Sequence, residues 1–304
     1  MKVLIVCSAN SGKIASFIQE QVNALNVLGI ETDYFLIQQK GLSGYLKARK
    51  GLLLKIKDFN PQIVHAHYGL SGLLANLQRK VPVITTYHGA DINELHLRRM
   101  SIFSILLSDY NIFVSKQMVE KVKFYLKRYS VIPCGVDYKV FFSIPKRDAR
   151  LKLGINLYKR IILFSSTFDR LDKNVPLAMD AVKAIPNAEL VELKGSSREE
   201  ISLLINACDA GLLTSYLEGS PMFIKELLAC NKPIVSTNVG DVAECITGID
   251  GCTIVSFNAE IVSLALQYSL LFDSIAVPAE ILERNDNRRI AKELVSVYNS
   301  VLNS

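Results

Sequence analysis

The chain has 304 residues, of which half are hydrophobic and 21% are charged, so it is neither disordered nor collagen-like and is long enough for two α/β domains. Residues 1–145 carry 18 Lys and Arg against 9 Asp and Glu, whereas residues 146–304 carry 17 against 20. The basic first half and the mildly acidic second half are therefore expected to meet different partners.

No apolar run reaches the length of a membrane span, and the one after Met1 is too short for a signal sequence. We therefore expect a cytoplasmic protein. With four histidines and no D-x-D triplet, no metal site is expected. The six cysteines form no C-x-x-C pair and are expected to be buried thiols: Cys7, Cys134, Cys208, Cys230, Cys245 and Cys252.

Strand-like and helical stretches alternate along the whole chain. In the first half, buried strands are predicted at 3–8, 32–37, 63–67, 82–87 and 111–115. After Pro145 the pattern resumes with strands at 161–166, 188–193, 210–215, 233–237 and 252–256. Repeated strand–helix units predict two parallel sheets covered on both faces.

A loop rich in Pro and Gly at 132–150 is the best candidate for a domain boundary. We expect an N-terminal domain at 1–144, a C-terminal domain at 145–285 and a last helix at 286–304 that packs back toward the N-terminal domain. Apolar residues at helical spacing support that helix: Ile290, Leu294, Val297 and Val301. Ligands of such sheets bind beyond the carboxyl ends of the strands.

The densest polar segment is 215–241. A strand-like run ends in a loop at Glu218, Pro221 then opens a helix with Ser220 as its expected N-cap, and Glu226 lies in the second turn. Open N–H groups at a helix start bind anions or hydroxyls, and two carboxylates suit the diols of a sugar or ribose. An ordinary turn residue and a solvated helix residue fit the two glutamates equally well.

Two further loops could hold phosphates. Arg170 and Lys173 follow a strand and stand near a helix start, where cations and backbone donors would bind a diphosphate, although both also fit as surface cations. Gly12 follows the first strand and would let the backbone approach a phosphate. That loop is not G-x-G-x-x-G, so a simple tight turn fits it too.

Three histidines lie where neighbouring parallel strands end. His65 and His67 belong to one predicted strand and His88 follows the next. Such clustering indicates a site. Asp91 could complete a metal-ligand set, and hydrogen bonding without a metal fits equally well.

In order and spacing, these motifs resemble the GT-B glycosyltransferases of family 4 (glycosyl transferases group 1), which use nucleotide-sugar donors with retention. The most specific element is E-x7-E, from Glu218 to Glu226. The resemblance covers nearly the whole chain and implies two doubly wound Rossmann-like domains facing an interdomain cleft. The other matching motifs are HAHY (65–68), TYHGAD (86–91), IPCGVDYKVF (132–141) and FDRLDKNVPLAMDAV (168–182).

The resemblance also implies a role for individual residues. Glu226 would bind the ribose hydroxyls, and Glu218 would hold the donor sugar with backbone N–H groups of 219–223. His88, Lys173 and Glu218 are the implied catalytic residues, and His65, His67 and Asp91 the implied acceptor side. The implied nucleotide-sugar set is Gly12, Arg170, Lys173, Gly195, Glu218, Gly219, Ser220, Pro221, Met222, Phe223 and Glu226.

The chain departs from the family pattern at several positions. Phe168 stands where the family has its phosphate-binding arginine, which Arg170 would replace from a shifted place. Ser11 stands for the second glycine of the phosphate loop, and Cys134 for the asparagine of the IPNG motif. The chain is also shorter than usual for the family, which implies trimmed loops in the acceptor half.

We therefore expect a metal-independent retaining transferase that moves a sugar from a nucleoside-diphosphate sugar to a saccharide or glycolipid hydroxyl, in cell-surface polysaccharide or glycolipid assembly. The donor is a substrate, and no cofactor is expected. Two alternatives remain open. A nucleotide-sugar epimerase or hydrolase would turn over the donor without an acceptor, and a silent GT-B subunit would bind a partner transferase.

The basic first half suits an anionic partner. A helix is predicted at 116–128, with lysines beside apolar residues, and a second basic tract spans 40–57. Both could bind the inner face of the cell membrane peripherally, or both could be solvated faces. Nucleic acid is not expected, because no aromatic residues are interleaved with basic ones in a binding motif.

Overall fold

The computed structural model describes residues 1–9, 12–39, 41–195 and 197–304. It contains two compact units, the first made of Met1–Gly135 with Asn287–Ser304 and the second of Val136–Asp286. The first unit ends at Gly135 rather than at residue 144. Its successor Val136 is buried with Phe141 in the core of the second unit, and the Val136 N–H donates to the Asn285 carbonyl at 2.8 Å.

Six parallel strands form the sheet of the first unit in the order β2-β1-β3-β4-β5-β6. All five strands that the sequence predicts in this half are present, and β6 adds a short edge. The strands are β1 (Lys2–Ser8), β2 (Glu31–Ile37), β3 (Ile63–His67), β4 (Val83–Tyr87), β5 (Tyr110–Phe113) and β6 (Tyr129–Val131).

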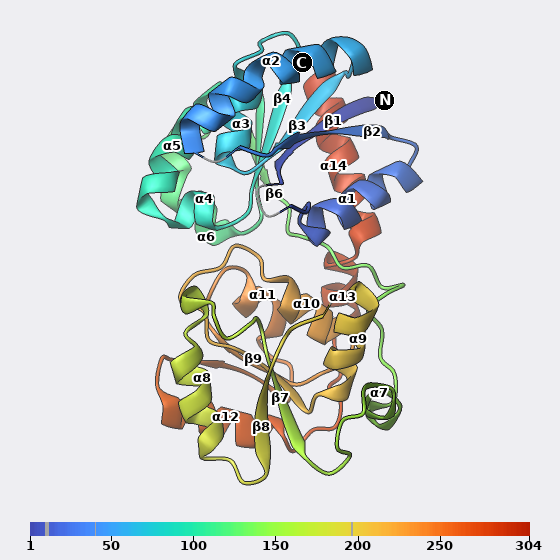
Figure 1. Cartoon of the computed structure of the whole chain (residues 1–304), viewed down its shortest axis with the longest axis vertical. Coiled ribbons are helices and arrows are strands. Elements are labelled where there is room, and N and C mark those ends of the chain that lie inside the picture. Colours follow the sequence, from blue (N-terminus) through green and yellow to red (C-terminus); the bar gives the residue numbers. More distant parts are fainter. Residues whose placement is uncertain (10–11, 40, 196) are drawn as a thin grey trace. The chain divides into compact units, whose positions relative to one another are not determined.

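Helices cover both faces of this sheet. One face packs against α1 and α14, and the other against α2 and α3. Figure 1 shows α14, in red, beside α1, in blue, although nearly the whole sequence separates them. The helices are α1 (Ser16–Val27), α2 (Gly41–Phe59), α3 (Gly69–Asn76), α4 (Ala90–Asn93), α5 (Leu95–Leu107), α6 (Lys116–Val122), α14 (Asn287–Leu302) and the 3₁₀ turn η1 (Lys123–Tyr125).

Five parallel strands form the sheet of the second unit in the order β11-β10-β9-β7-β8. Each corresponds to a predicted strand. They are β7 (Arg160–Phe164), β8 (Ala188–Glu192), β9 (Ala210–Leu213), β10 (Ile234–Thr237) and β11 (Cys252–Val255). α8 and α12 cover one face, and α9, α10 and α11 cover the other (Figure 1). The helices are α7 (Lys146–Leu153), α8 (Val175–Lys183), α9 (Arg198–Ala207), α10 (Met222–Ala229), α11 (Val242–Ile246), α12 (Ala259–Ser269), α13 (Ala279–Arg284) and the 3₁₀ turn η2 (Leu171–Lys173).

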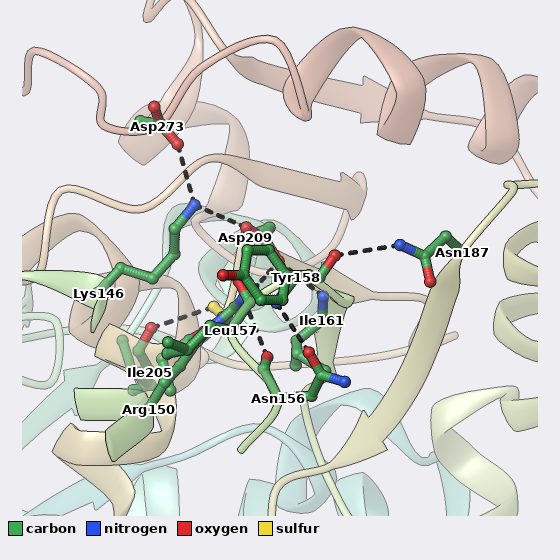
Figure 2. A network of polar contacts seen from close by, with 12 residues as sticks. Lys146, Arg150, Asn156, Leu157, Tyr158, Ile161, Asn187, Ile205, Asp209 and Asp273 are labelled. Carbon is green, nitrogen blue, oxygen red and sulfur yellow. Dashed lines mark hydrogen bonds and ion pairs between the residues drawn. The ribbon is translucent and has the colours of Figure 1, made fainter. Parts of the chain in front are cut away.

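A partly buried polar network fixes α7 to the amino ends of β7 and β9. Figure 2 shows Arg150 and Lys146 from α7 converging on Asp209, with the Arg150 Nη2 at 2.6 Å from Asp209 Oδ2 and the Lys146 Nζ at 2.7 Å from Oδ1. The Ile161 N–H donates to the same carboxylate at 2.7 Å. Both carboxylate oxygens of Asp209 are thus used structurally, at the end of the sheet opposite to the predicted site.

Candidate functional site

The second sheet reverses its winding between β7 and β9, which are hydrogen-bonded neighbours although β8 lies between them in sequence. At such a switch point the loops that follow the two strands diverge, and the space beyond their carboxyl ends takes a ligand. Lys173 stands in the loop after β7 and Glu218 in the loop after β9. The topology therefore brings two predicted site residues to one position.

Lys173 and Glu218 form an ion pair, with Nζ at 2.5 Å from Oε1. The Ser215 hydroxyl donates to the same carboxylate oxygen at 2.7 Å, and Asp172 Oδ2 lies 3.4 Å from Nζ. Both partners of the pair are mostly buried, with side chains 14% and 17% exposed. The Lys173 ammonium is thus held by two carboxylates in the loops that follow β7 and β9.

Arg170 does not join this pair. It is exposed and bonds Asp172 through two parallel contacts of 2.9 Å, which raise the pKa of the guanidinium and lower that of the carboxyl. Phe168, at the position of the family's arginine, packs against the core of the second unit. The cationic side of this loop is thus Lys173, with Arg170 turned to a local partner.

Helix α10 begins just after the loop that carries Glu218. The sequence predicts Ser220 as its N-cap, which is wrong: the cap position is Pro221, and the Ser220 hydroxyl donates to Asp241 instead, at 2.8 Å. No side chain caps the helix, so among the described residues the first-turn N–H groups of Met222 and Phe223 keep no capping partner. Only the backbone of Phe223 can face a ligand, because its side chain is in the core.

Glu226 lies on the second turn of α10 and is 2% exposed. Burial raises the pKa of its carboxyl, and Arg198 opposes that rise through an ion pair of 2.5 Å. The Arg198 guanidinium also lies over the Phe141 ring, 4.5 Å from its centroid. The alternative of a solvated glutamate is therefore excluded, and Arg198 is the ionic partner of Glu226, which no motif in the sequence indicated.

Two predicted glycines stand at strand ends. Gly195, after β8, is exposed, and a Cβ there would lie 2.8 Å from the Ile201 side chain, which explains the need for glycine. Gly12, after β1 in the first unit, has a φ of +83° and donates its N–H to the Ala9 carbonyl in a tight turn. Its neighbours Asn10 and Ser11 lie outside the described residues.

The three histidines of the first unit form a chain of contacts at the carboxyl ends of β3 and β4. His67 and His88 are hydrogen-bonded, Nδ1 to Nε2, at 2.9 Å, and their rings stack. His65 bonds the Tyr298 hydroxyl and the Thr86 hydroxyl, both at 2.7 Å. Burial holds the pKa of His65 and of His88 near 3, and that of His67 well below its usual value, so all three rings are neutral.

His88 has contacts at both ring nitrogens. Its Nδ1 lies 3.8 Å from the Cys134 thiol, and the rings of Phe17 and Tyr68 pack against it at 4.8 Å between centroids. The buried Nε2 of His67 has no partner among the described residues. An orphaned lone pair costs less than an orphaned N–H, so His67 donates from Nδ1 and His88 carries its proton on Nδ1.

Asp91 is buried, and its side chain bonds the backbone of the loops that follow β3 and β4. Its carboxylate accepts backbone N–H bonds from Gly69, His88 and Gly89 at 2.9–3.3 Å. Burial raises the pKa of Asp91 to about 6, although these bonds oppose the rise. Within the part of the chain that the structure describes, no three His, Cys, Asp or Glu side chains are grouped to hold a metal ion. The six cysteines are free thiols, five of them buried.

Both units match known protein families. Residues 2–140 match the family described as Glycosyltransferase Family 4, and residues 174–268 match Glycosyl transferases group 1. The second match includes helix α8, which follows Lys173, and the E-x7-E segment from Glu218 to Glu226. Together the two matches cover most of the chain, which is therefore similar to glycosyltransferases of family 4 and group 1.

Among curated relatives of this chain is TuaC of Bacillus subtilis, a glycosyltransferase named for teichuronic acid biosynthesis, which is 24% identical over 62% of this chain and 56% of its own length. An uncharacterized glycosyltransferase of Methanocaldococcus jannaschii is 28% identical over 70% of this chain and 65% of its own length. The chain thus spans less than two thirds of the length of these relatives.

Solved structures share the GT-B fold. Sucrose-phosphate synthase of Thermosynechococcus elongatus has a TM-score of 0.83 at 15% identity, with both chains fully covered. HepE of Anabaena, solved with UDP-glucose, has a TM-score of 0.74 at 14% identity, covering 99% of this chain and 100% of HepE. The predicted fold of two Rossmann-like domains is confirmed. No helix among the described residues is long and apolar enough to cross a membrane.

Proposed function

We propose that this protein transfers a sugar from a nucleoside-diphosphate sugar to a hydroxyl of a saccharide or glycolipid acceptor. The carrying observation is the Lys173–Glu218 pair of 2.5 Å at the switch point of the second sheet, beside the uncapped start of α10. It supplies a fixed cation for a diphosphate and a carboxylate for sugar hydroxyls. HepE, a structural neighbour, was solved with UDP-glucose, which supports this class of donor.

The reaction forms one bond and breaks one bond. The acceptor oxygen bonds to the anomeric carbon of the donor, and the bond from that carbon to the β-phosphate oxygen breaks with its electron pair passing to the diphosphate. The acceptor proton passes to a leaving phosphate oxygen. We propose attack on the face that the diphosphate leaves, with retention of configuration, which NMR of the newly formed product identifies.

Negative charge grows on the diphosphate as it leaves. Lys173 and the N–H groups at the start of α10 would meet that charge without reorganising, because the loops already hold them. One preorganised donor of this kind contributes about 3 kcal/mol to the transition state, or more than a hundredfold in rate. On this proposal the cation role belongs to protein groups, no cofactor takes part, and transfer persists in excess chelator.

Glu226 suits the ribose of the donor. Its carboxylate is buried and already ordered by Arg198, so it can accept two neighbouring hydroxyls with little further loss of conformational freedom. The first unit would supply the acceptor side. There His88, with a neutral ring and its proton on Nδ1, is the proposed contact to the reacting region, and His65, His67 and Asp91 hold the surrounding loops.

A thermal-shift screen with UDP-, GDP- and ADP-sugars tests the donor site directly. A true donor binds only the folded protein and therefore raises the melting temperature. At a concentration of 100 Kd it adds about 2.7 kcal/mol to the free energy of unfolding. Lys173→Ala and Glu226→Ala should each reduce the shift. Lys183→Ala, which removes an exposed lysine on α8, is the matched control and should leave it unchanged.

Two results would contradict the proposal. Full shifts in both site variants would mean that the nucleotide sugar binds elsewhere. Binding without transfer to any acceptor would instead favour a silent subunit, an alternative that the pairing of Arg170 with Asp172 supports. Hydrolysis or epimerisation of the donor without an acceptor would identify a different reaction on this scaffold.

We further propose that the first unit binds anionic membranes, where glycolipid acceptors for cell-surface assembly occur. The predicted helix at 116–128 ends at Val122, where the chain turns into η1, and its residues Val119 and Val122 are buried. What stays exposed is Phe124, at 89%, and Tyr125. η1 contacts α5, whose outer face carries Leu95, Arg99, Phe103 and Leu106 at helical spacing.

Exposed aromatic and aliphatic side chains among cations are the combination that inserts into an anionic bilayer surface. Phe103→Ser with Phe124→Ser should therefore weaken binding to phosphatidylglycerol vesicles at least tenfold, measured by sedimentation. Tyr158→Ser, at an equally exposed aromatic residue of the second unit, is the control. No binding of the parent chain at low salt would contradict this part of the proposal.

A further inference from the structure

A second buried ion pair lies next to the loop at Gly219–Pro221, which we call the donor loop, and is not used by the mechanism above. The Lys225 side chain is on α10 and has no exposed surface. Its ammonium contacts the Ser220 hydroxyl and lies 3.0 Å from Asp241 Oδ2. The Ser220 hydroxyl in turn donates to the same Asp241 oxygen at 2.8 Å. We refer to Lys225, Ser220 and Asp241 as the loop clamp.

The loop clamp joins two loops that touch through their backbones. Gly219 to Pro221 precede α10, and Val239 to Asp241 precede α11. Gly240 has a φ of +58°, and a Cβ there would lie 2.4 Å from the Gly219 carbonyl oxygen. The two loops therefore approach as closely as glycine allows, and the polar contacts fix them in that register.

The loop clamp is poorly built for stability alone. Asp241 is buried, yet its Oδ1 has no hydrogen-bond partner among the described residues. Replacing a buried ion pair by apolar residues is often neutral or stabilising, because the charges must be stripped of water. A costly pair with an unsatisfied oxygen, placed against the donor loop, indicates that its value lies in fixing that loop.

We propose that Lys225 and Asp241 are positioning residues that hold the Gly219–Ser220 backbone where it meets the sugar part of the donor. This inference rests on the proposed function. The nucleotide part meets other groups, namely Lys173, Glu226 and the first-turn N–H groups of α10. The loop clamp therefore sets the affinity that the sugar adds to the nucleoside diphosphate, and leaves the affinity for the nucleoside diphosphate itself unchanged.

Calorimetry with the donor found in the thermal-shift screen, and with its nucleoside diphosphate alone, separates these two affinities. The variants are Lys225→Met, Asp241→Asn and the double variant that carries both. The double variant has no unpaired buried charge, so it keeps a folded protein available if the single variants fail to fold. Lys232→Met, at a buried lysine of the same unit outside the loop clamp, is the matched control.

The expected result is that the double variant binds the nucleoside diphosphate within about twofold of the parent chain, but the nucleotide sugar at least tenfold more weakly, with a raised KM for the donor. Normal binding of the nucleotide sugar by the folded double variant would overturn the role proposed for the loop clamp and leave the proposed function intact. An equal loss for both ligands would also overturn it. Failure of the parent chain to bind any nucleotide sugar would overturn the proposed function and this inference with it.

Discussion

Arg198 decides the state of the most buried carboxylate in the second unit. Glu226 keeps its charge only against the cost of burial, and the Arg198 guanidinium at 2.5 Å compensates that cost. The same guanidinium stacks over Phe141, which limits the positions that it can take. Arg198, at the start of α9, thus stabilises the ionised form of Glu226 on α10.

Arg198→Met should destabilise α10 by about 3 kcal/mol, because it leaves a buried carboxylate without its ionic partner. The raised pKa of Glu226 makes the loss larger as pH rises, since the protonated form needs no partner and the ionised form does. Hydrogen–deuterium exchange of α10 peptides at pH 5 and pH 8 measures the difference. Arg147→Met, at an exposed arginine of α7, is the control.

If Arg198→Met lowered the protection of α10 equally at both pH values, relative to the parent chain and after correction for intrinsic exchange, Glu226 would not depend on this ion pair.

The candidate site residues differ in how well their positions can be predicted from the sequence. Lys173 and Glu218 follow strands that a doubly wound order makes adjacent, so their meeting is predictable. Arg198, Lys225 and Asp241 meet through the packing of α9, α10 and α11, which no short motif specifies.

Elements follow the sequence closely where the apolar pattern is continuous. Each of the ten predicted strands forms, because β-branched runs of four to seven residues suit buried parallel strands. The helix predicted at 116–128 is the clearest error. Its apolar positions continue past Val122, but Phe124 and Tyr125 are exposed, so composition alone could not separate a buried face from a surface turn.

The helix α14 illustrates the opposite case. Its predicted apolar positions Ile290, Leu294, Val297 and Val301 are all buried against the sheet and α1. Lys225 carried a usable signal too, since a lysine inside the apolar run FIKELL must either reach solvent or find a buried partner. Its partner could be known only from the fold.

Leu294→Ala should destabilise the first unit by about 3 kcal/mol, since it removes a fully buried side chain and leaves a cavity. The measurement is hydrogen–deuterium exchange of peptides from β1 and α1, which share that core. Lys292→Ala, at an exposed position on the same helix, should change exchange little. If both variants exchanged alike, α14 would not support the core that its contacts indicate.

At the scale of the molecule, acid acts first on the first unit. His65, His67 and His88 have depressed pKa values, so the unfolded chain binds protons that the folded chain refuses. The stabilising contribution of the three neutral histidines is therefore fully present above pH 6.5. Below that pH the free energy of unfolding falls by about 1.4 kcal/mol per pH unit for each proton that the unfolded chain takes up. Asp91, whose pKa is raised, opposes this fall between pH 6 and 3.8.

We expect peptides of β3 and β4 to lose protection as pH falls from 7.5 to 5, after correction for intrinsic exchange, while peptides of β7 and β9 change less. His65→Gln should flatten the dependence by about one proton. His96→Gln, at an exposed histidine, should leave it unchanged. Equal acid sensitivity of the two sheets would contradict neutral buried imidazoles in the first unit.

Because α14 belongs to the first unit but follows the second in sequence, the chain passes between the units twice, after Gly135 and after Asp286. A ribosome therefore delivers everything that the second unit needs before it makes the helix that closes the first. The second unit can fold before synthesis ends, while the apolar residues of β1 and α1 that α14 covers stay exposed to solvent. During synthesis, these residues form the surface that a chaperone must shield longest.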